Sequence, residues 1–510
     1  MRYDSLTFIV LVFAGLPAAS KAFATEPSTS GRPNIVMILA DDMAWDDCGA
    51  FGNSKIRTPN IDSIAREGMR FDRAFLTCSS CSPSRSSIIT GRYPHSTDAE
   101  ELHWPLPAEQ VTFVEQLKAN GYWTALAGKW HLGPAVKSRF DVVHEGGVSN
   151  FQLPSKKSKD QPRLKPQAKG ESASGCDQWV STLRGRPQDR PFFLWLASFD
   201  PHRDYEPDTL ASPHKPADVS VPPFLPDTPE VRGDLAQYYD EITRLDQYVG
   251  AVLEELERQQ VEKETIVLFL SDNGRPFPRC KTTLYDSGIK TPWLMRWPGR
   301  ITPGTRCERL VSSVDIAPTF LALAKVAPRP GLQGRDFSPL LSTPGVKIRD
   351  VVFAEHNWHD YAADARAART ERFKYIRNYD TVLPLTPPAD AVRSPTFVAM
   401  RQLRDQKGLT EAQNACFVKP RPEEELYDTE ADPHELRNLI NDPTHAKPLA
   451  ALREALADWE VETNDQRPRE LSPDEFDRET GTPLPNRKRP RPSKQEKQAK
   501  AKAHAVPVKP

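Results

Sequence analysis

The 510-residue sequence predicts an α/β fold in which helices cover both faces of a mixed, mostly parallel sheet, followed by a smaller α+β unit. Three observations lead to this prediction. Four continuous apolar runs each end in a cluster of polar residues, as strands buried in a parallel sheet do. Helical periodicity fills the intervals between them. After about residue 345 the pattern changes to short strands and one late helix.

The four apolar runs are the predicted strands of the large sheet. Residues 34–40 (NIVMILA) run directly into two aspartates, and residues 122–127 run into Gly-Lys-Trp-His. Residues 192–199 and 266–270 run into Asp-Pro-His and Ser-Asp-Asn-Gly. Because ligands bind at the carboxyl ends of parallel strands, these four polar clusters predict one composite site drawn from distant segments.

Helices are expected between and after these strands. Asn60 is a candidate cap for a short helix that ends near Glu67, and apolar residues from Leu235 to Leu256 recur at helical spacing. In the smaller unit we expect strands at 351–354 and 373–376 and a helix around Trp459. The predicted catalytic domain spans residues 25–345, and the C-terminal α+β subdomain spans residues 346–470.

The two ends of the chain differ in composition from the segments between them. Residues 1–24 carry an apolar run and a small-x-small site at Ala22-Phe23-Ala24, which predicts a signal peptide rather than a retained anchor. We therefore expect an exported protein that has no membrane span after cleavage and that lies in a periplasmic, extracellular or lysosome-like compartment. Residues 471–510 are expected to form a basic, disordered tail. The net charge of −1 gives no global attraction to nucleic acid, so we expect no nucleic-acid partner.

The most informative segment surrounds Cys81, one of seven cysteines. Pro83 suits the first turn of a helix and Gly91 suits its end, so Cys81 is expected at a helix N-terminus near Arg85. Such a position stabilises an anion or lowers the pKa of a thiol. Disulfide pairing among the other six cysteines is left open.

This segment resembles the signature of the type I sulfatases, Cys-x-Pro-Ser-Arg followed by Thr-Gly, which is matched from Cys81 to Thr90 and Gly91. The resemblance implies an alkaline-phosphatase-like fold. It also implies that Cys81 is converted to formylglycine by a formylglycine-generating or anaerobic sulfatase-maturing enzyme. Long matches at residues 218–229 and 271–278 resemble the heparan N-sulfatase (N-sulfoglucosamine sulfohydrolase) branch most.

A metal site is predicted from the acidic residues. Asp41, Asp42 and Asp272 at one sheet edge would repel one another without a cation, and Asn273 adds an amide oxygen. An oxygen-only set favours Ca²⁺ over Mg²⁺ and disfavours zinc. The resemblance adds the modified Cys81 side chain and the substrate sulfate as metal contacts.

Basic residues and histidines supply the expected chemistry. Arg85, Lys129 and Lys281 are candidates to bind the sulfate oxygens, and His131 and His202 are candidate proton carriers. The resemblance implies that hydrated formylglycine attacks sulfur while His202, with Lys281, protonates the leaving group. The second hydroxyl then expels sulfate, with His131 as the base.

The substrate is expected to be a sulfated saccharide, with the N-sulfate of glucosamine in heparin-like glycans as the first choice. The alternatives are an O-sulfatase on another sulfated polysaccharide and a catalytically silent glycan-binding protein. Lys281 stands where relatives on this branch can carry arginine, which leaves the choice between N- and O-sulfate open. His356 and Arg369 either contact a uronate or second sulfate, or join the two domains through salt bridges.

Overall fold

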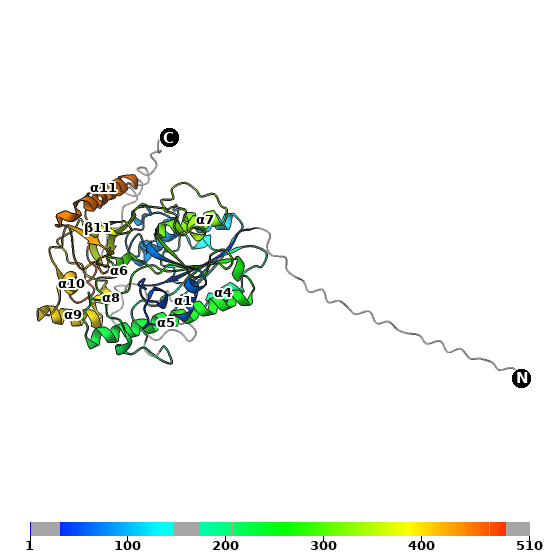
Figure 1. Ribbon diagram of the computed structural model, residues 1–510, viewed down its shortest axis with the longest axis horizontal. Coiled ribbons are helices and arrows are strands. Elements are labelled where there is room, and N and C mark those ends of the chain that lie inside the picture. The colour runs from blue at the N-terminus through cyan, green and yellow to red at the C-terminus, as the bar shows by residue number, and fades with distance from the viewer. Residues whose placement is uncertain (2–30, 147–173, 207–208, 469, 486–510) are drawn as a thin grey trace. The chain divides into compact units, whose positions relative to one another are not determined.

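The computed structural model describes residues 1, 31–146, 174–206, 209–468 and 470–485. The expected signal peptide therefore lies outside the described residues apart from Met1, and so does the expected tail from residue 486 onward. The described residues from Arg32 belong to one compact unit that contains two β-sheets (Figure 1).

The larger sheet has eight strands in the order β4-β3-β5-β1-β6-β7-β2-β8. Neighbouring strands are parallel except at β7, which is antiparallel to both β6 and β2. The strands are β1 (Asn34–Ala40), β2 (Met69–Phe75), β3 (Trp123–Gly128), β4 (Val142–Glu145), β5 (Phe192–Ala197), β6 (Thr265–Ser271), β7 (Leu294–Arg296) and β8 (Thr305–Ser312).

Both faces of this sheet are covered, as the apolar runs predict. In β1, Val36 and Ile38 belong to the core on one face, whereas Ile35 and Met37 belong to the core on the other. Figure 1 shows α1, α4 and α5 on one side of the sheet and α7 on the other. The first face carries α1 (Pro59–Arg66), α4 (Trp179–Arg184) and α5 (Pro229–Arg258), and the second carries α2 (Cys81–Thr90), α3 (Phe113–Ala119) and α7 (Ile316–Leu323).

The smaller sheet is antiparallel, with the order β12-β11-β10-β9, and α11 packs on it. Its strands are β9 (Val352–His359), β10 (Tyr361–Arg369), β11 (Phe373–Asn378) and β12 (Glu424–Asp428). The predicted fold class is therefore confirmed. The remaining helices are α6 (Asp286–Ile289), α8 (Ala389–Val392), α9 (Pro395–Asp405), α10 (Glu411–Asn414) and α11 (Ala446–Glu462).

The start of α1 differs from the prediction that Asn60 caps it. The helix begins at Pro59, and Asp246 of α5 accepts hydrogen bonds from the backbone N–H groups of Asn60 (3.0 Å) and Ile61 (2.7 Å). A carboxylate from a distant helix thus satisfies the free N–H groups that a local side chain was expected to satisfy. Local sequence does not reveal a cap that comes from 186 residues away.

Residues 471–485, expected to belong to the disordered tail, lie against the body of the protein. Ser472 donates to Glu101 (2.6 Å), Trp358 donates to the carbonyl of Pro473 (3.1 Å), and Asp474 accepts from the backbone of Ala362 (2.7 Å). This segment is held by scattered polar contacts. Apolar periodicity, the signal used to place the end of the folded region, does not detect such contacts.

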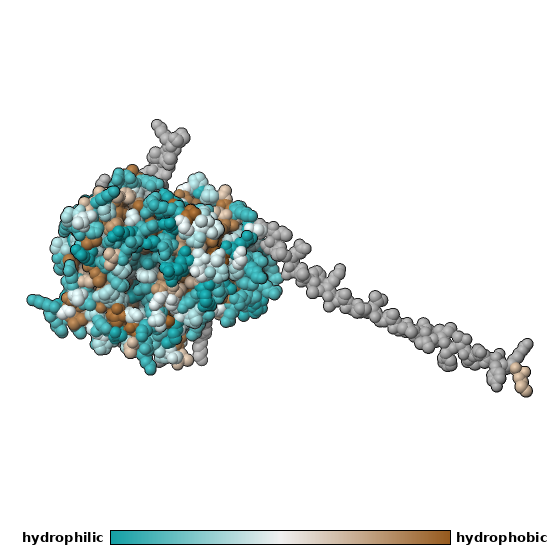
Figure 2. Space-filling view, viewed as in Figure 1, coloured by the Kyte–Doolittle hydropathy of each residue, from teal (hydrophilic) through white to brown (hydrophobic). Residues whose placement is uncertain are grey.

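The face shown in Figure 2 is mostly hydrophilic, with small and scattered hydrophobic areas. Among the described residues, no helix combines the length and the apolar character that crossing a membrane requires.

Candidate active site

The site forms where β1 and β6 end side by side. Ala40 and Ser271 are register partners in these parallel strands, so Asp41 and Asp42 emerge next to Asp272 and Asn273. The backbone N–H of Asp272 donates to the carbonyl of Ala40 (3.2 Å), and that of Asp42 donates to the Asp272 carboxylate (3.3 Å). All three carboxylates are completely buried.

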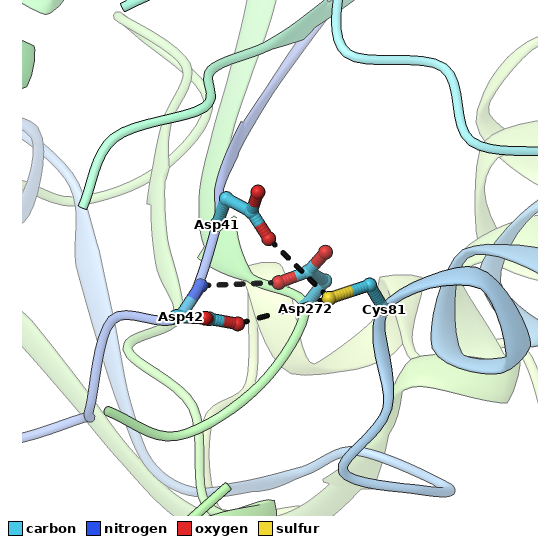
Figure 3. A group of neighbouring side chains, drawn as sticks. All are labelled: Asp41, Asp42, Cys81 and Asp272. Atoms are coloured by element: carbon cyan, nitrogen blue, oxygen red, sulfur yellow. Dashed lines mark hydrogen bonds between the residues drawn. The ribbon is translucent and has the colours of Figure 1, made fainter. Parts of the chain in front are cut away.

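Cys81 meets these residues from the N-terminus of α2. Its Sγ lies 3.6 Å from Asp41 Oδ1 and 3.8 Å from Asp42 Oδ1 (Figure 3). The same Sγ accepts from the amide of Asn273 at 3.2 Å. As predicted, α2 contains Pro83 in its first turn and ends at Gly91, whose φ of 66° is left-handed. The sequence thus places Cys81 at the one end of the helix that faces the sheet edge.

Three cations lie within the same cluster. Lys281 Nζ is 2.7 Å from Asp42, Arg85 Nε is 2.7 Å from Asp272, and Lys129 pairs with Asp41. Each aspartate therefore has its own opposite charge, which buried carboxylates require. We expected these cations to contact the sulfate and the aspartates to contact a metal ion. In the structure the cations and the aspartates form ion pairs with one another.

Burial and these charges set the protonation of the cluster. Burial alone would raise the pKa of Asp41, but Lys129, His202 and Arg85 hold it below its usual value. Burial raises the pKa of Asp272 to about 6 despite Arg85. Burial also raises the pKa of the Cys81 thiol, so the unmodified side chain is a poor nucleophile at neutral pH.

The donor set fits a calcium ion. One atom each of Asp41, Asp42, Cys81 and Asp272 lie within 4.8 Å of one another. Asn273 Oδ1 is buried and has no hydrogen-bond partner among the described residues, while the Nδ2 of the same amide points at Asp42 and Asp272. Exchanging the two ends of the amide presents an oxygen beside the three carboxylates, and these four side chains suit Ca²⁺, whereas the sulfur of unmodified Cys81 does not.

Two histidines from neighbouring strands border the cluster. His202, after β5, places Nε2 3.7 Å from Asp42 and 3.8 Å from Asp390. His131, after β3, has a left-handed φ of 63° and its Nε2 lies 2.7 Å from Nδ1 of His103. Burial and the neighbouring His103 and Lys129 charges lower the pKa of His131 well below its usual value, so it is neutral and able to accept a proton.

Three residues near the site were missed by the sequence analysis. Asp390 begins α8 in a proline-rich stretch without a motif, and His103 follows a loop of no regular pattern. His359, the last residue of β9, was not predicted as a site residue, and its Nδ1 lies 2.8 Å from the hydroxyl of Ser80, directly before Cys81. None of the three sits at the end of a predicted strand, which was the signal used.

The two expected substrate-binding residues lie elsewhere. Arg369, on β10 of the smaller sheet, is buried and makes two contacts of 3.0–3.1 Å with Asp286 of α6. This is the salt bridge that we gave as the alternative to substrate binding. His356, on β9, is buried, and its Nε2 has no hydrogen-bond partner among the described residues. Burial and nearby arginines lower the pKa of His356 to about 3. Neither side chain contacts the cluster around Cys81.

Comparison with known proteins gives consistent results. The family model described as Sulfatase matches residues 33–326, and the one described as N-sulphoglucosamine sulphohydrolase, C-terminal, matches residues 279–384. Human N-sulphoglucosamine sulphohydrolase is 33% identical, covering 85% of this chain and 91% of its own length. An ulvan-active sulfatase of Formosa agariphila is 30% identical, covering 86% and 76%.

Solved structures share the fold. A protein in complex with its substrate D-glucosamine-2-N,6-O-disulfate aligns with a TM-score of 0.64 at 20% identity, covering 86% of this chain and 99% of that chain. A 2-O glycosaminoglycan sulfatase aligns with a TM-score of 0.62 at 21% identity, covering 85% and 93%.

Proposed function

Because this chain belongs to the sulfatase family, whose members hydrolyse sulfate esters or sulfamates, we propose that it removes the N-sulfate from glucosamine in a heparin-like glycan. The observation that carries the proposal is Cys81 at the N-terminus of α2, buried against three aspartates and three cations. Similarity to human N-sulphoglucosamine sulphohydrolase over both sheets favours the sulfamate over an ester.

The nucleophile in this proposal is Cys81 after conversion to formylglycine. Its thiol is buried and its pKa is raised, so the unmodified residue lacks the thiolate that attack on sulfur requires. Formylglycine, once hydrated, supplies two hydroxyl groups on one carbon, of which one attacks sulfur and the other later expels sulfate. Conversion requires a formylglycine-generating or anaerobic sulfatase-maturing enzyme.

The surrounding charges bind the sulfate. Arg85 Nη2 is buried and has no hydrogen-bond partner among the described residues, which makes it a donor available to a sulfate oxygen. Lys129 and Lys281 enclose the same space from β3 and from the loop after β6. Donors fixed in a buried site stabilise charge that shifts among the sulfate oxygens as the bond to the leaving group breaks.

Proton transfer is divided between two histidines. His202 lies beside Asp42 and Asp390 and donates to the leaving group, with Lys281 nearby. His131 is neutral and accepts a proton when sulfate is released. Asp41, Asp42, Asp272 and Asn273 would hold the calcium ion, which would supply positive charge beside the sulfate. We further propose that the protein is exported, because residues 1–24 carry an apolar run followed by a small-x-small cleavage site.

The nucleophile is tested by Cys81→Ser in protein made with a formylglycine-generating system. We expect the wild-type peptide that contains Cys81 to carry the aldehyde by mass spectrometry, and the variant to lose sulfate release by at least a thousandfold, because serine lacks the second hydroxyl. Cys78→Ala, three residues earlier, is the matched control and should keep activity. Unmodified Cys81 in an active enzyme would refute the proposed nucleophile.

A further inference from the structure

Asp390 lies beside His202, the residue to which the proposed reaction assigns protonation of the leaving group. Its Oδ2 is 3.8 Å from Nε2 of His202, too long for a hydrogen bond, and its Oδ1 accepts from the backbone of Ala391 at 2.7 Å. Among the described residues Oδ2 accepts no hydrogen bond, and the side chain keeps 17% of its exposure. One carboxylate oxygen is therefore open beside the candidate proton donor.

The surroundings keep this carboxylate ionised. Burial would raise the pKa of Asp390, but Lys281, His202 and Arg203 hold it below its usual value. The neighbouring Asp360 accepts from the backbone of Ala389 (2.9 Å), which fixes the start of α8 and hence the position of Asp390. Asp390 is thus a fixed negative charge next to the two groups, His202 and Lys281, assigned to the leaving-group side.

Sulfamates and sulfate esters differ at the bridging atom between the sugar and sulfur, which is nitrogen in a sulfamate and oxygen in an ester. Hydrolysis of the sulfamate is R–NH–SO₃⁻ + H₂O → R–NH₃⁺ + SO₄²⁻, so the bridging nitrogen carries a hydrogen at the start and gains two protons as the N–S bond breaks. The ester oxygen carries no hydrogen, and its product is a neutral alcohol. A carboxylate accepts from an N–H and attracts an ammonium, whereas it repels the lone pairs of an ester oxygen.

We propose that Asp390 is a specificity-determining residue whose Oδ2 accepts the sulfamate N–H and binds the ammonium of the product, selecting N-sulfate over O-sulfate. The inference rests on the proposed function and deepens it, because it names the residue that distinguishes a leaving nitrogen from a leaving oxygen.

The test compares N-sulfoglucosamine with glucosamine 6-O-sulfate for the wild type, Asp390→Asn and Asp405→Asn, each normalised to its formylglycine content. Asp390→Asn should lower kcat/KM for the sulfamate by about tenfold or more, the usual effect of one charged hydrogen bond, while the ester rate stays equal or rises. Asp405→Asn removes an exposed carboxylate at the end of α9 that pairs with Arg404, and it should leave the ratio of the two rates unchanged. Parallel loss on both substrates in Asp390→Asn would overturn the assignment.

A second measurement needs only the wild type. Glucosamine, an ammonium at neutral pH, should inhibit at least tenfold more strongly than N-acetylglucosamine, and equal inhibition by the two sugars would contradict the assignment. Failure of the proposed function and failure of the role of Asp390 give different results. If the wild type cleaves only the 6-O ester, the proposed function fails; if it cleaves the sulfamate and Asp390→Asn keeps the substrate ratio, only the role of Asp390 fails.

Discussion

Each buried carboxylate around Cys81 has a basic partner of its own: Asp42 with Lys281, Asp272 with Arg85, and Asp41 with Lys129. The near-neutral sum allows six charged side chains to be buried together, because an uncompensated charge in this interior would cost several kcal/mol. The same pairing holds every donor in a fixed direction. The site is thereby organised for an anion before the anion arrives.

His356 is a buried histidine that makes the fold sensitive to acid. Its pKa is about 3 in the folded protein, against about 6.5 when unfolded, so between these values only the unfolded chain binds the proton. Stability therefore rises with pH across this window and falls, by up to about 1.4 kcal/mol per pH unit from this group, as pH drops below about 6.5. We expect His356→Gln to reduce that loss.

Urea unfolding at pH 7, 6, 5 and 4.5 measures the effect of His356→Gln. The free energy of unfolding of the wild type should fall faster than that of the variant as the pH decreases. Replacing the exposed His144 by Gln is the control and should not change the slope. Equal slopes for the wild type and His356→Gln would show that His356 does not set this dependence.

At the scale of elements, a buried ion-pair network ties the small sheet to the loop that carries Lys281. Lys374 on β11 is fully buried, donates to the carbonyl of Leu284 (3.0 Å) and pairs with Glu435 (2.7 Å) and Asp286. Arg369 on β10 pairs with the same Asp286. The smaller sheet thus supports the loop that carries Lys281, and Arg369 is part of this network.

Lys374→Met should destabilise the protein by about 3–5 kcal/mol, because it leaves Glu435 buried without its cation. Thermal and urea unfolding measure the loss. Arg372, directly before β11, forms an exposed salt bridge with Asp428. Arg372→Met is therefore the matched control and should cause a much smaller change. Equal losses in the two variants would contradict the importance of the buried network.

For the whole molecule, the site depends on segments that are far apart in the sequence. Asp42 and Asp272 are separated by 230 residues, and Cys81 is the first residue of a different element, helix α2. A cation bound to these groups is bound only by the folded chain. Calcium binding is therefore expected to stabilise the entire compact unit, by about 2.7 kcal/mol when free calcium is a hundredfold above its dissociation constant.

Removal of calcium with a chelator should lower the melting temperature, and added Ca²⁺ should restore it at lower concentration than Mg²⁺. Differential scanning calorimetry with and without the chelator measures both shifts. In Asp272→Asn the response to calcium should be weaker, because one carboxylate ligand is lost. A wild-type melting temperature that does not respond to the chelator or to calcium would remove the proposed metal site.

Strands β1, β3, β5 and β6 of the large sheet were predictable because they are buried on both faces. The other four were not predicted, because β2, β4 and β8 are only partly buried and β7 has three residues. Strand β1 matches the prediction at both ends, and α5 follows its apolar stripe. Strand β10 (YAADARAAR) was not predicted, since alanine and alternating polar residues give no strand signal. Its conformation comes from pairing with β9 and β11 on either side.

The sequence by itself determined four adjacent strands of the large sheet and the residues at their carboxyl ends, because an apolar run followed by polar groups is a local pattern that parallel strands align. Only the tertiary structure decided which charges meet. It paired Lys281 with Asp42, committed Arg369 to Asp286, and brought Asp390 from the start of α8 to His202. These contacts join residues separated by as many as 239 positions, and no local periodicity encodes such a distance.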